Sequence, residues 1–273
     1  MTAAFTKGHG TGNDFVIVPD PAGDLKLTPA DVAVMCDRRR GIGGDGLLRV
    51  VRTAAEPDVA HRSAEAEWFM DYRNADGSLA EMCGNGARVF ARYLVESGLA
   101  TGPRVGILTR AGLVTAEVGD ASVAVTMPLP VVGGPGSTHL SGVDYEGTTA
   151  TCGNPNLVCA IPAPSLLDEL DLSGTPQFDP ARFPDRANVE FVVPVGPGHV
   201  RMRVIERGVG ETLSCGSGAC AVAGVVLDGR EGTVTIDVPG GRLTVTIADG
   251  ACVLAGPAVL VASGTTSLLA AHP

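Results

Sequence analysis

The sequence predicts an α+β protein made of two similar halves. The first observation is a repeated segment, in which Met70–Ala87 aligns without a gap on Met202–Ala219. The second is that runs of short strand-like segments are separated by few helix-like segments, which fits α+β better than alternating βαβ units. The third is the length of 273 residues, which is enough for two domains of about 130 residues each.

The repeat continues downstream, where Gly112–Asp120 recurs as Gly241–Asp249. We therefore expect one half over 1–130 and another over 131–262, with the tail 263–273 joining the first half. The stretch 128–136 (MPLPVVGGPG) is rich in Pro and Gly and is predicted to be a linker.

The individual elements follow from alternation, β-branched residues and cap signals. Strands are predicted over 14–18, 47–51, 67–73, 105–109, 112–118, 122–127, 149–152, 156–161, 189–195, 200–206, 233–238, 242–248, 251–254 and 258–262, and helices over 28–38, 84–97, 164–171 and 216–228. Thr28 and Pro29 form a start signal for the first helix. The segment 216–228 has no consistently polar face, so we expect it to be buried on all sides, for example inside a strongly bent sheet.

The composition excludes several classes of partner. The net charge of −10 argues against nucleic acid and against an anionic membrane surface. Because no window approaches 18 uninterrupted apolar residues, no membrane span is expected. The first ten residues lack the pattern of a secretory signal, and seven cysteines in such a chain indicate thiols in a reducing cytoplasm.

Two cysteines, Cys83 and Cys215, each follow a strand-like stretch and open a helix-like run. A cysteine at a helix start faces backbone N–H groups and the positive end of the helix dipole, which stabilise a thiolate and lower the thiol pKa. The small residues behind them let a ligand approach the backbone, and such helix starts bind carboxylates. We predict a pair of thiols acting on one substrate, whereas the other five cysteines are more typical of buried structural positions.

Several rival sites are disfavoured. No C-x-x-C pair exists and the five histidines lack metal-ligand spacing, so no metal is expected. Gly41–Gly46 matches a dinucleotide-binding pattern, but a strand-like segment follows it where a helix is needed, so a turn is the better interpretation. Lys7 is the only serious candidate for a pyridoxal lysine and has no phosphate-binding neighbours, so we expect no cofactor. A disulfide between Cys83 and Cys215 would be an oxidised, inactive form.

Four asparagines are placed at the ends of predicted strands: Asn13, Asn74, Asn154 and Asn188. Each alone is equally consistent with a turn, but together they suggest a ring of ligand-binding amides. Glu206 and Arg207 precede Cys215 and form either a surface pair or, through the guanidinium, a clamp for a carboxylate.

Taken together, these phrases resemble the diaminopimelate epimerases. The matching segments are Lys7–Gly10, Gly12–Phe15, Asn74–Ser78, Met82–Gly86, Gly153–Pro155, Glu206–Gly208, Gly210–Thr212 and Cys215–Gly218. The resemblance implies two pseudo-symmetric halves, each a curved sheet or barrel around a central helix, with the active site in the cleft between them. It implies cofactor-independent epimerisation of LL-diaminopimelate to meso-diaminopimelate, a step of lysine and cell-wall precursor biosynthesis.

The resemblance also assigns roles to individual residues. Cys83 and Cys215 would be the two acid/base groups, with Glu206 polarising a cysteine. The reacting carboxylate would lie on the N–H groups of Gly84, Asn85, Gly216 and Ser217, and the distal amino-acid head would contact Asn13, Asn74, Asn154, Asn188 and Arg207. The only partner expected is a small amino acid, and a homodimer is compatible with such a chain.

The sequence departs from the family pattern at two positions. Asn156 replaces a histidine that assists one thiol, and Gly46 replaces a common glutamine. Asn156 therefore keeps open the alternative of a racemase for another amino acid, of the histidine or proline type. A ligand-binding or scaffold relative without catalysis would tolerate loss of one thiol, yet both remain.

Overall fold

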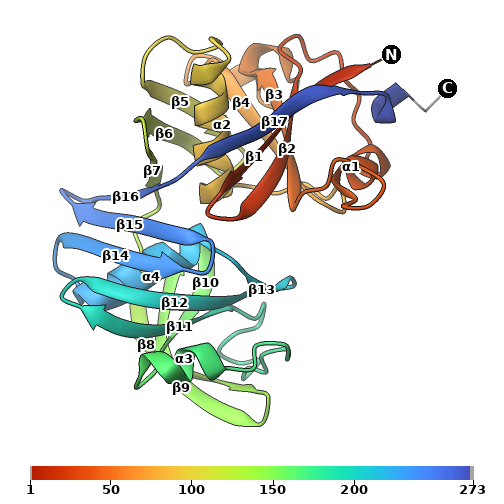
Figure 1. Ribbon diagram of the computed structural model, residues 1–273. Coiled ribbons are helices and arrows are strands. Elements are labelled where there is room, and N and C mark those ends of the chain that lie inside the picture. The colour runs from red at the N-terminus through yellow and green to blue at the C-terminus, as the bar shows by residue number, and fades with distance from the viewer. Residues whose placement is uncertain (1, 271–273) are drawn as a thin grey trace. The chain divides into compact units, whose positions relative to one another are not determined.

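The computed structural model describes residues 2–270 and divides into two compact units. The first unit contains the chain up to residue 125 together with the residues from 257 onward, and the second contains residues 126–256. Each unit is a mixed sheet with few helices, so the α+β class predicted from the sequence is confirmed. The first and the last described residues, 2 and 270, both belong to the first unit (Figure 1).

The first unit is built around helix α2. Its strands are β1 (Ala3–Gly10), β2 (Asn13–Pro19), β3 (Gly46–Arg52), β4 (Trp68–Asn74), β5 (Arg104–Thr109), β6 (Gly112–Val118), β7 (Val123–Met127) and β17 (Val259–Thr266), and its helices are α1 (Pro29–Cys36) and α2 (Gly84–Glu96), with 3₁₀ turns at Thr53–Ala55, Ala60–Arg62 and Leu268–Ala270. Helix α1 begins as predicted, because the Thr28 side chain accepts a hydrogen bond from the Asp31 N–H and Pro29 occupies the first turn.

The second unit is built around helix α4. Its strands are β8 (Val131–Leu140), β9 (Val143–Cys152), β10 (Asn154–Ala160), β11 (Asn188–Gly196), β12 (His199–Glu206), β13 (Gly210–Thr212), β14 (Gly232–Val238), β15 (Gly241–Ala248) and β16 (Ala251–Gly256), and its helices are α3 (Pro164–Glu169) and α4 (Gly216–Leu227). A separate apolar cluster fills the space beneath α3, where Leu167 packs with Phe183 and Phe191.

Strand order and strand direction are the same in the two units. The first has the order β17-β1-β2-β3-β4-β5-β6-β7, and the second has β8-β9-β10-β11-β12-β14-β15-β16. In both, successive pairs are antiparallel, antiparallel, parallel, antiparallel, parallel, antiparallel and antiparallel. The parallel pairs are bridged by α1 and α2 in one unit and by α3 and α4 in the other. The sequence repeat is thus a repeat of topology.

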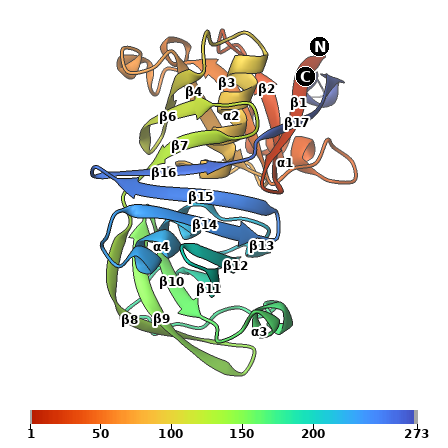
Figure 2. The same cartoon turned by 60° about the vertical axis from the view of Figure 1, so that its left-hand side comes forward.

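Helices α2 and α4 are the central helices of their units. Helix α2 contacts β1 to β6 and β17, and it is buried from Gly84 to Leu94. Helix α4 contacts β8 to β11 and β14 to β16, and it is buried from Gly218 to Gly224, as its lack of a polar face predicts. Figures 1 and 2 show strands on several sides of each helix. Within residues 2–270 no pairing joins the two end strands of either unit, so each sheet is curved but not closed.

The predicted linker over 128–136 is wrong for most of its length, because β8 begins at Val131. Gly133, Gly134 and Pro135 of this stretch lie where the β8–β9 register shifts between Val132 and Pro135. Strand β8 pairs only with β9 inside its unit, and such an edge tolerates Pro and Gly. Strand β1 was not predicted either, since its glycines hide the pattern. At Gly8, an added Cβ would lie 2.9 Å from Val89 of α2, so the glycine allows the strand to pack against the helix.

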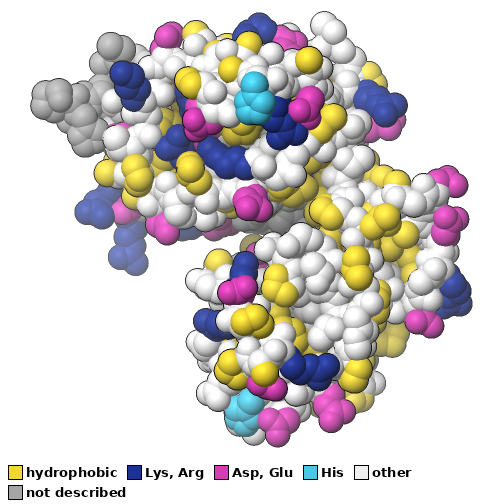
Figure 3. Space-filling view, turned by 180° about the vertical axis from the view of Figure 1, so that it is seen from behind, with side chains coloured by type: hydrophobic (Ala, Val, Ile, Leu, Met, Phe, Trp, Pro, Cys, Tyr) yellow, Lys and Arg dark blue, Asp and Glu magenta, His cyan; other side chains and the backbone are white. Residues whose placement is uncertain are grey.

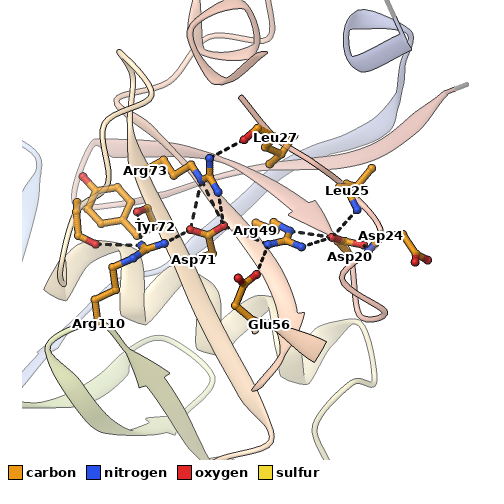
Figure 4. A network of polar contacts seen from close by, with 11 residues as sticks. Asp20, Asp24, Leu25, Leu27, Arg49, Glu56, Asp71, Tyr72, Arg73 and Arg110 are labelled. Atoms are coloured by element: carbon orange, nitrogen blue, oxygen red, sulfur yellow. Dashed lines mark hydrogen bonds and ion pairs between the residues drawn. The ribbon is translucent and has the colours of Figure 1, made fainter. Parts of the chain in front are cut away.

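A network of buried charges joins β3 and β4 to the segment after β2 (Figure 4). The Arg49 guanidinium on β3 donates to Asp20 at 2.7 Å and to Glu56 at 2.6 Å. Asp71 on β4 is 1% exposed and accepts from Arg73 at 3.0 Å and from Arg110. Burial opposes ionisation of Asp71, but the two arginines outweigh it, so its pKa is lowered. Because every charge here has a partner, the network fixes the strands that lead towards α2.

The surface carries charges of both signs. On the face drawn in Figure 3, basic and acidic side chains are interspersed on each unit. Among the described helices, none combines the length and the hydropathy needed to cross a bilayer.

Candidate active site

In the first unit, Cys83 lies at the cap position of α2. Its backbone is extended (φ −139°, ψ 120°), and its Sγ accepts a hydrogen bond from the Gly86 N–H at 3.4 Å. The sulfur therefore takes the place of the oxygen that usually caps a helix. The remaining N–H groups of the first turn, including those of Gly84 and Asn85, point in the same direction towards the positive end of the helix dipole.

Asn13 and Asn85 lie beside the Cys83 sulfur. The Cys83 Sγ donates to Asn13 Oδ1 at 3.6 Å, and Asn85 Nδ2 donates to the same oxygen at 3.3 Å. The amide of Asn13 in turn donates to Asp45 at 2.8 Å. Two of the predicted binding residues are thus brought to one thiol at the start of α2.

A buried arginine that the sequence analysis missed holds Asn85 in place. Arg88 is 0% exposed and donates from Nη2 to Asn85 Oδ1 at 2.8 Å and to Thr11 at 3.2 Å. Its Nη1 donates to the Gly84 carbonyl at 3.2 Å. An arginine one turn after the cysteine, on an otherwise buried helix, was the available signal for this role.

Asn74 lies at the same edge of the sheet. It ends β4 opposite Gly46, and Gly46 is also in register with Phe15, two residues after Asn13. Its side chain accepts from the Tyr72 hydroxyl at 3.1 Å and donates to Ser78 at 3.0 Å. Both ends of the Asn74 amide are therefore engaged by near neighbours in the chain, one on β4 and one in the turn that follows.

In the second unit, Cys215 occupies the equivalent cap position of α4. Its Sγ accepts from the Gly218 N–H at 3.4 Å and lies 3.4 Å from the Ser217 hydroxyl. Cys215 is 5% exposed, whereas Cys83 is half-buried. The two capping thiols thus share a geometry but differ in their access to solvent.

Asn188 and Asn156 lie behind Cys215. Asn188 Nδ2 donates to Asn156 Oδ1 at 3.1 Å and more weakly to Cys215 Sγ at 3.9 Å, and its Oδ1 accepts from the Arg207 N–H at 2.9 Å. Asn156 donates to the Asn154 carbonyl at 2.7 Å. Asn156 and Asn188 therefore form a neutral amide pair, whereas a histidine at position 156 could have carried a positive charge.

The other predicted residues of this unit lie nearer the surface. Glu206 accepts from the Thr212 hydroxyl at 2.5 Å. The Arg207 side chain is exposed and donates to the Asp185 carbonyl at 3.1 Å, and the Asn154 side chain is exposed as well. Arg207 and Asn154 are therefore accessible to a ligand.

The environment of Cys215 does not favour its thiolate. Burial raises the pKa of the Cys215 thiol well above its ordinary value, and the Glu206 and Glu190 carboxyl groups raise it further. The hydrogen bonds from Ser217 and Gly218 act in the opposite direction but do not prevail. The expectation that a helix start lowers the pKa of this thiol is therefore wrong for Cys215, because burial and the two carboxyl groups outweigh the hydrogen bonds that its sulfur receives at the helix start.

The remaining cysteines are buried and none caps a helix. Burial raises the pKa of Cys36 to about 11 and that of Cys159 to about 12. Cys220 lies among Cys152 and Cys252, whose hydrogen bonds raise the pKa of its thiol.

The alternative sites have ordinary structural roles. Gly41–Gly46 leads directly into β3 and not into a helix. Lys7 is bound by Asp14 at 2.6 Å and by the Gly43 carbonyl. Over the described part of the chain, no cluster of three or more His, Cys, Asp or Glu side chains is arranged to hold a metal ion.

The sequence matches a known protein family over most of its length. The model of the diaminopimelate epimerase family matches residues 5–131 and 148–261, which include both cysteines. The chain belongs to the diaminopimelate epimerase family. As a member of that family it is an isomerase. The unmatched stretch between the two segments coincides with most of the β8–β9 hairpin, where the linker prediction failed.

Individual relatives are similar in sequence to this chain over nearly its whole length. The chain is 51% identical to the diaminopimelate epimerase of Streptomyces coelicolor, covering 96% of this chain and 94% of that protein. It is 50% identical to the diaminopimelate epimerase of Thermobifida fusca, covering 97% of this chain and 98% of that protein. It is 49% identical to that of Mycobacterium ulcerans, covering 96% of each.

Solved structures show that the family's fold is shared more widely. A PhzF-family phenazine biosynthesis protein of Bacillus anthracis superposes with a TM-score of 0.69 at 17% identity, covering 97% of this chain and 99% of that chain. A hydroxyproline epimerase of Agrobacterium vitis superposes with a TM-score of 0.64 at 16% identity, covering 97% of this chain and 91% of that chain. At these identities the likeness concerns the two-domain fold alone.

Proposed function

We propose that this protein interconverts LL- and meso-diaminopimelate without a cofactor, using Cys83 and Cys215 as opposed acid and base. The observation that carries the proposal is that each thiol caps a central helix, α2 or α4, at the same point of a repeated topology. The names of the relatives that match at about half identity supply the substrate. The reaction would belong to lysine and cell-wall precursor biosynthesis in the cytoplasm.

The chemistry requires two groups because a stereocentre is inverted. One group must remove the α-hydrogen from one face while the other delivers a proton to the opposite face. In the proposed cycle, a thiolate takes the α-proton, and the second cysteine gives its own proton to the same carbon. The electron pair of the broken C–H bond forms the new one. Afterwards the two sulfurs have exchanged protonation states, so the reverse reaction uses them in the opposite roles.

The environments of the two thiols favour a starting assignment. Burial and two neighbouring carboxyl groups raise the pKa of Cys215, so we assign it as the thiol that donates. Cys83 is more accessible than Cys215, so we assign it as the base. The proposal requires that one bound substrate reach both sulfurs.

The substrate's reacting carboxylate would be held by backbone N–H groups of Gly84, Asn85, Gly216 and Ser217. Negative charge develops on this carboxylate as the α-proton leaves, and preorganised N–H groups at a helix start stabilise it most where water is excluded. Arg88 contributes indirectly, because it fixes the position of Asn85.

The distal amino-acid head would contact Asn13, Asn74, Asn154, Asn188 and Arg207. Arg207 and Asn154 are exposed and available for this role, and an arginine suits a second carboxylate. Asn188 already bonds Asn156 and the Arg207 backbone, so we propose that it also sets the position of the arginine.

The test measures turnover of LL-diaminopimelate in deuterium oxide, with Cys83→Ala and Cys215→Ala as variants. We expect deuterium at one α-carbon, and a loss of epimerisation of at least about a hundredfold in each variant. Full activity in both variants would contradict the two-thiol mechanism. Cys220→Ala is the matched control, because this cysteine lies on α4 but does not cap it, and it should retain activity.

Asn156 favours one competing substrate class, amino acids racemised on the same fold. A racemisation screen that includes histidine, proline and diaminopimelate decides between them. Turnover of another amino acid with none on diaminopimelate would replace the proposed substrate.

A further inference from the structure

The turn Asn74–Ser78 follows β4, and its last three residues have no role in the mechanism above. The Asn74 N–H donates to the Ser78 carbonyl at 2.9 Å, and the Gly77 N–H donates to the Asn74 carbonyl at 2.9 Å. Gly77 has a φ of +85°, and an added Cβ there would clash with the backbone of Pro29 at the start of α1. Because the turn is closed by backbone hydrogen bonds and packed against a helix, its side chains have a defined place.

Asp76 sets the direction of a short chain of hydrogen bonds in this turn. Its Oδ1 accepts from the Ser78 N–H at 2.9 Å and from the Ser78 hydroxyl at 2.6 Å. These two hydrogen bonds lower the pKa of Asp76, so its carboxyl group is ionised at neutral pH and can only accept. The single hydrogen of the Ser78 hydroxyl is therefore committed to Asp76.

The same direction continues through the amide of Asn74. Since the Ser78 hydroxyl has given its hydrogen to Asp76, it can only accept from Asn74, and Nδ2 lies 3.0 Å from Ser78 Oγ. At the opposite end of the amide, Oδ1 accepts from the Tyr72 hydroxyl at 3.1 Å. Tyr72 alone could not select this orientation, because a hydroxyl can both donate and accept. Ser78, held by Asp76, therefore decides which end of the Asn74 amide faces which neighbour.

One hydrogen of the Asn74 amide is left for a ligand. Nδ2 carries two hydrogens, and Ser78 receives one of them. Over residues 2–270, the Asn74 side chain makes hydrogen bonds only with Ser78 and Tyr72. Because Asn74 is half-buried and not enclosed, a ligand oxygen that approaches it meets an N–H whose direction is set in advance.

The second unit provides an internal comparison. The repeated segment aligns each residue of this chain of hydrogen bonds with one that lacks its function: Asn74 with Glu206, Ser78 with Gly210, and Tyr72 with Val204. A carboxylate presents two equivalent oxygens, so it needs no partner to select its orientation, whereas an amide has two different ends. The orienting hydroxyls thus accompany the amide and are missing beside the carboxylate.

We propose that Ser78 is a positioning residue for substrate binding. Its hydroxyl, held by Asp76, turns the Asn74 amide so that the second Nδ2 hydrogen meets an oxygen of the substrate's distal carboxylate. The inference rests on the proposed function, in which Asn74 contacts the distal head of diaminopimelate. Ser78 touches Asn74, so its effect on the substrate passes through that amide.

The test compares the steady-state kinetics of diaminopimelate epimerisation in Ser78→Ala and Ser78→Thr. In Ser78→Ala the amide can turn, so KM should rise about tenfold with a smaller change in kcat. Ser78→Thr keeps the hydroxyl and should keep the KM of the parent protein. An unchanged KM in Ser78→Ala would overturn the proposal, and so would an equal rise in both variants.

A double-mutant cycle tests the link to Asp76. Asp76→Ala should raise KM by a factor similar to that of Ser78→Ala, and the double variant should be no worse than either, because both residues act through the same amide. Independent, additive losses would contradict a chain that runs from Asp76 to Asn74.

Ser173→Ala is the matched control, because Ser173 follows Asp171 in the same Asp-x-Ser arrangement. Its N–H lies 3.0 Å and its hydroxyl 2.7 Å from Asp171 Oδ1, and both residues are exposed. The substitution removes an equivalent hydrogen bond from a turn that has no part in the site, so KM should not change. A rise equal to that in Ser78→Ala would assign the effect to turn stability and overturn the proposal.

A measurement without substrate separates this proposal from the proposed function. In ¹⁵N-labelled protein, the side-chain amide signals of Asn74 are those lost in Asn74→Asp. The hydrogen bonded to Ser78 should exchange with solvent more slowly than the other, and the two rates should become equal in Ser78→Ala. Equal rates in the parent protein would overturn the positioning role. Unequal rates in a parent that does not epimerise diaminopimelate would support the positioning of Asn74 and contradict the proposed substrate.

Discussion

Asn188 donates a hydrogen bond to Asn156 at 3.1 Å, and this contact joins the parallel strands β10 and β11 directly behind Cys215. Both side chains are almost completely buried. The pair is neutral at every pH, so it supplies position without charge. The pKa of the Cys215 thiol is therefore raised by burial and, in addition, by the Glu206 and Glu190 carboxyl groups, with no charged group opposing them from this pair.

Introducing a histidine tests this point. In Asn156→His, a protonated ring beside Cys215 should favour its thiolate and increase the rate of its alkylation at neutral pH about tenfold. Asn156→Ala is the control, because it removes the contact with Asn188 without adding a base. It should cost about 1 to 3 kcal/mol of unfolding free energy and give no such increase. An equal rate increase in both variants would point to loosened packing instead.

Arg88 should matter for the site beyond its contribution to stability. Arg88→Met removes the donors that hold Asn85 and the Gly84 carbonyl, so we expect a fall in kcat together with a loss of about 1 to 3 kcal/mol of stability. Arg92→Met is the matched control, since Arg92 is also buried on α2 but donates to the Gly119 carbonyl at 2.7 Å. Comparable unfolding free energies with kcat lowered only in the first variant would confirm the positioning role. Equal kcat values would contradict it.

The buried network around Asp71 should govern stability in acid. The lowered pKa of Asp71 means that its stabilisation is complete above the ordinary aspartate pKa and is lost as the pH falls through its lower folded value. Asp71→Asn should cost about 3 to 5 kcal/mol at pH 7, because it leaves arginines without their partner. The deficit should shrink as the pH falls below about 4. Urea denaturation across this range measures it.

A surface pair provides the comparison for that experiment. Arg52 and Glu67 form an ion pair in which both side chains are at least half exposed. Glu67→Gln should change the free energy of unfolding by less than about 1 kcal/mol, both at pH 7 and below about pH 4. A loss as large as that of Asp71→Asn would show that burial is not the decisive factor.

The two helix starts should respond differently to the same substitution. Gly218→Ala places a methyl group 2.5 Å from Glu190 Oε1, whereas the nearest atom to the added methyl in Gly86→Ala is 3.4 Å away. We expect the first to cost about 1 to 3 kcal/mol of unfolding free energy and the second to cost less. Glu190→Ala combined with Gly218→Ala should recover part of the loss in a double-mutant cycle. Additive losses would show that the two residues do not clash.

Much of the fold could be predicted from local signals. Both central helices were located by the repeated cysteine phrase, and most strands by alternation, because those patterns reflect burial inside one element. Strands β1 and β8 were missed because their glycines and prolines suit close packing or a sheet edge. Those requirements are set by other parts of the chain, which a local pattern does not contain.

The residues of the candidate site were likewise predictable only where a local motif marks them. Cys83 and Asn13 could be named from motifs, and the structure shows their contact. Arg88 and Glu190 escaped notice because a charged residue within an apolar run is ordinarily solvated, and only the packing of α2 and α4 reveals their complete burial. The pKa of Cys215 could not be inferred from its helix start alone, because desolvation depends on the whole surrounding sheet.

The tight fit between Gly218 and Glu190 restricts the order in which this protein could have changed over evolution. A shorter residue at 190 removes the atoms that a side chain at 218 would meet, whereas a side chain gained at 218 must displace the carboxyl group while the acid is present. A change at 190 therefore lowers the cost of a later change at 218. A lineage that keeps the acid loses stability when glycine at 218 is replaced, and one that has lost the acid loses less.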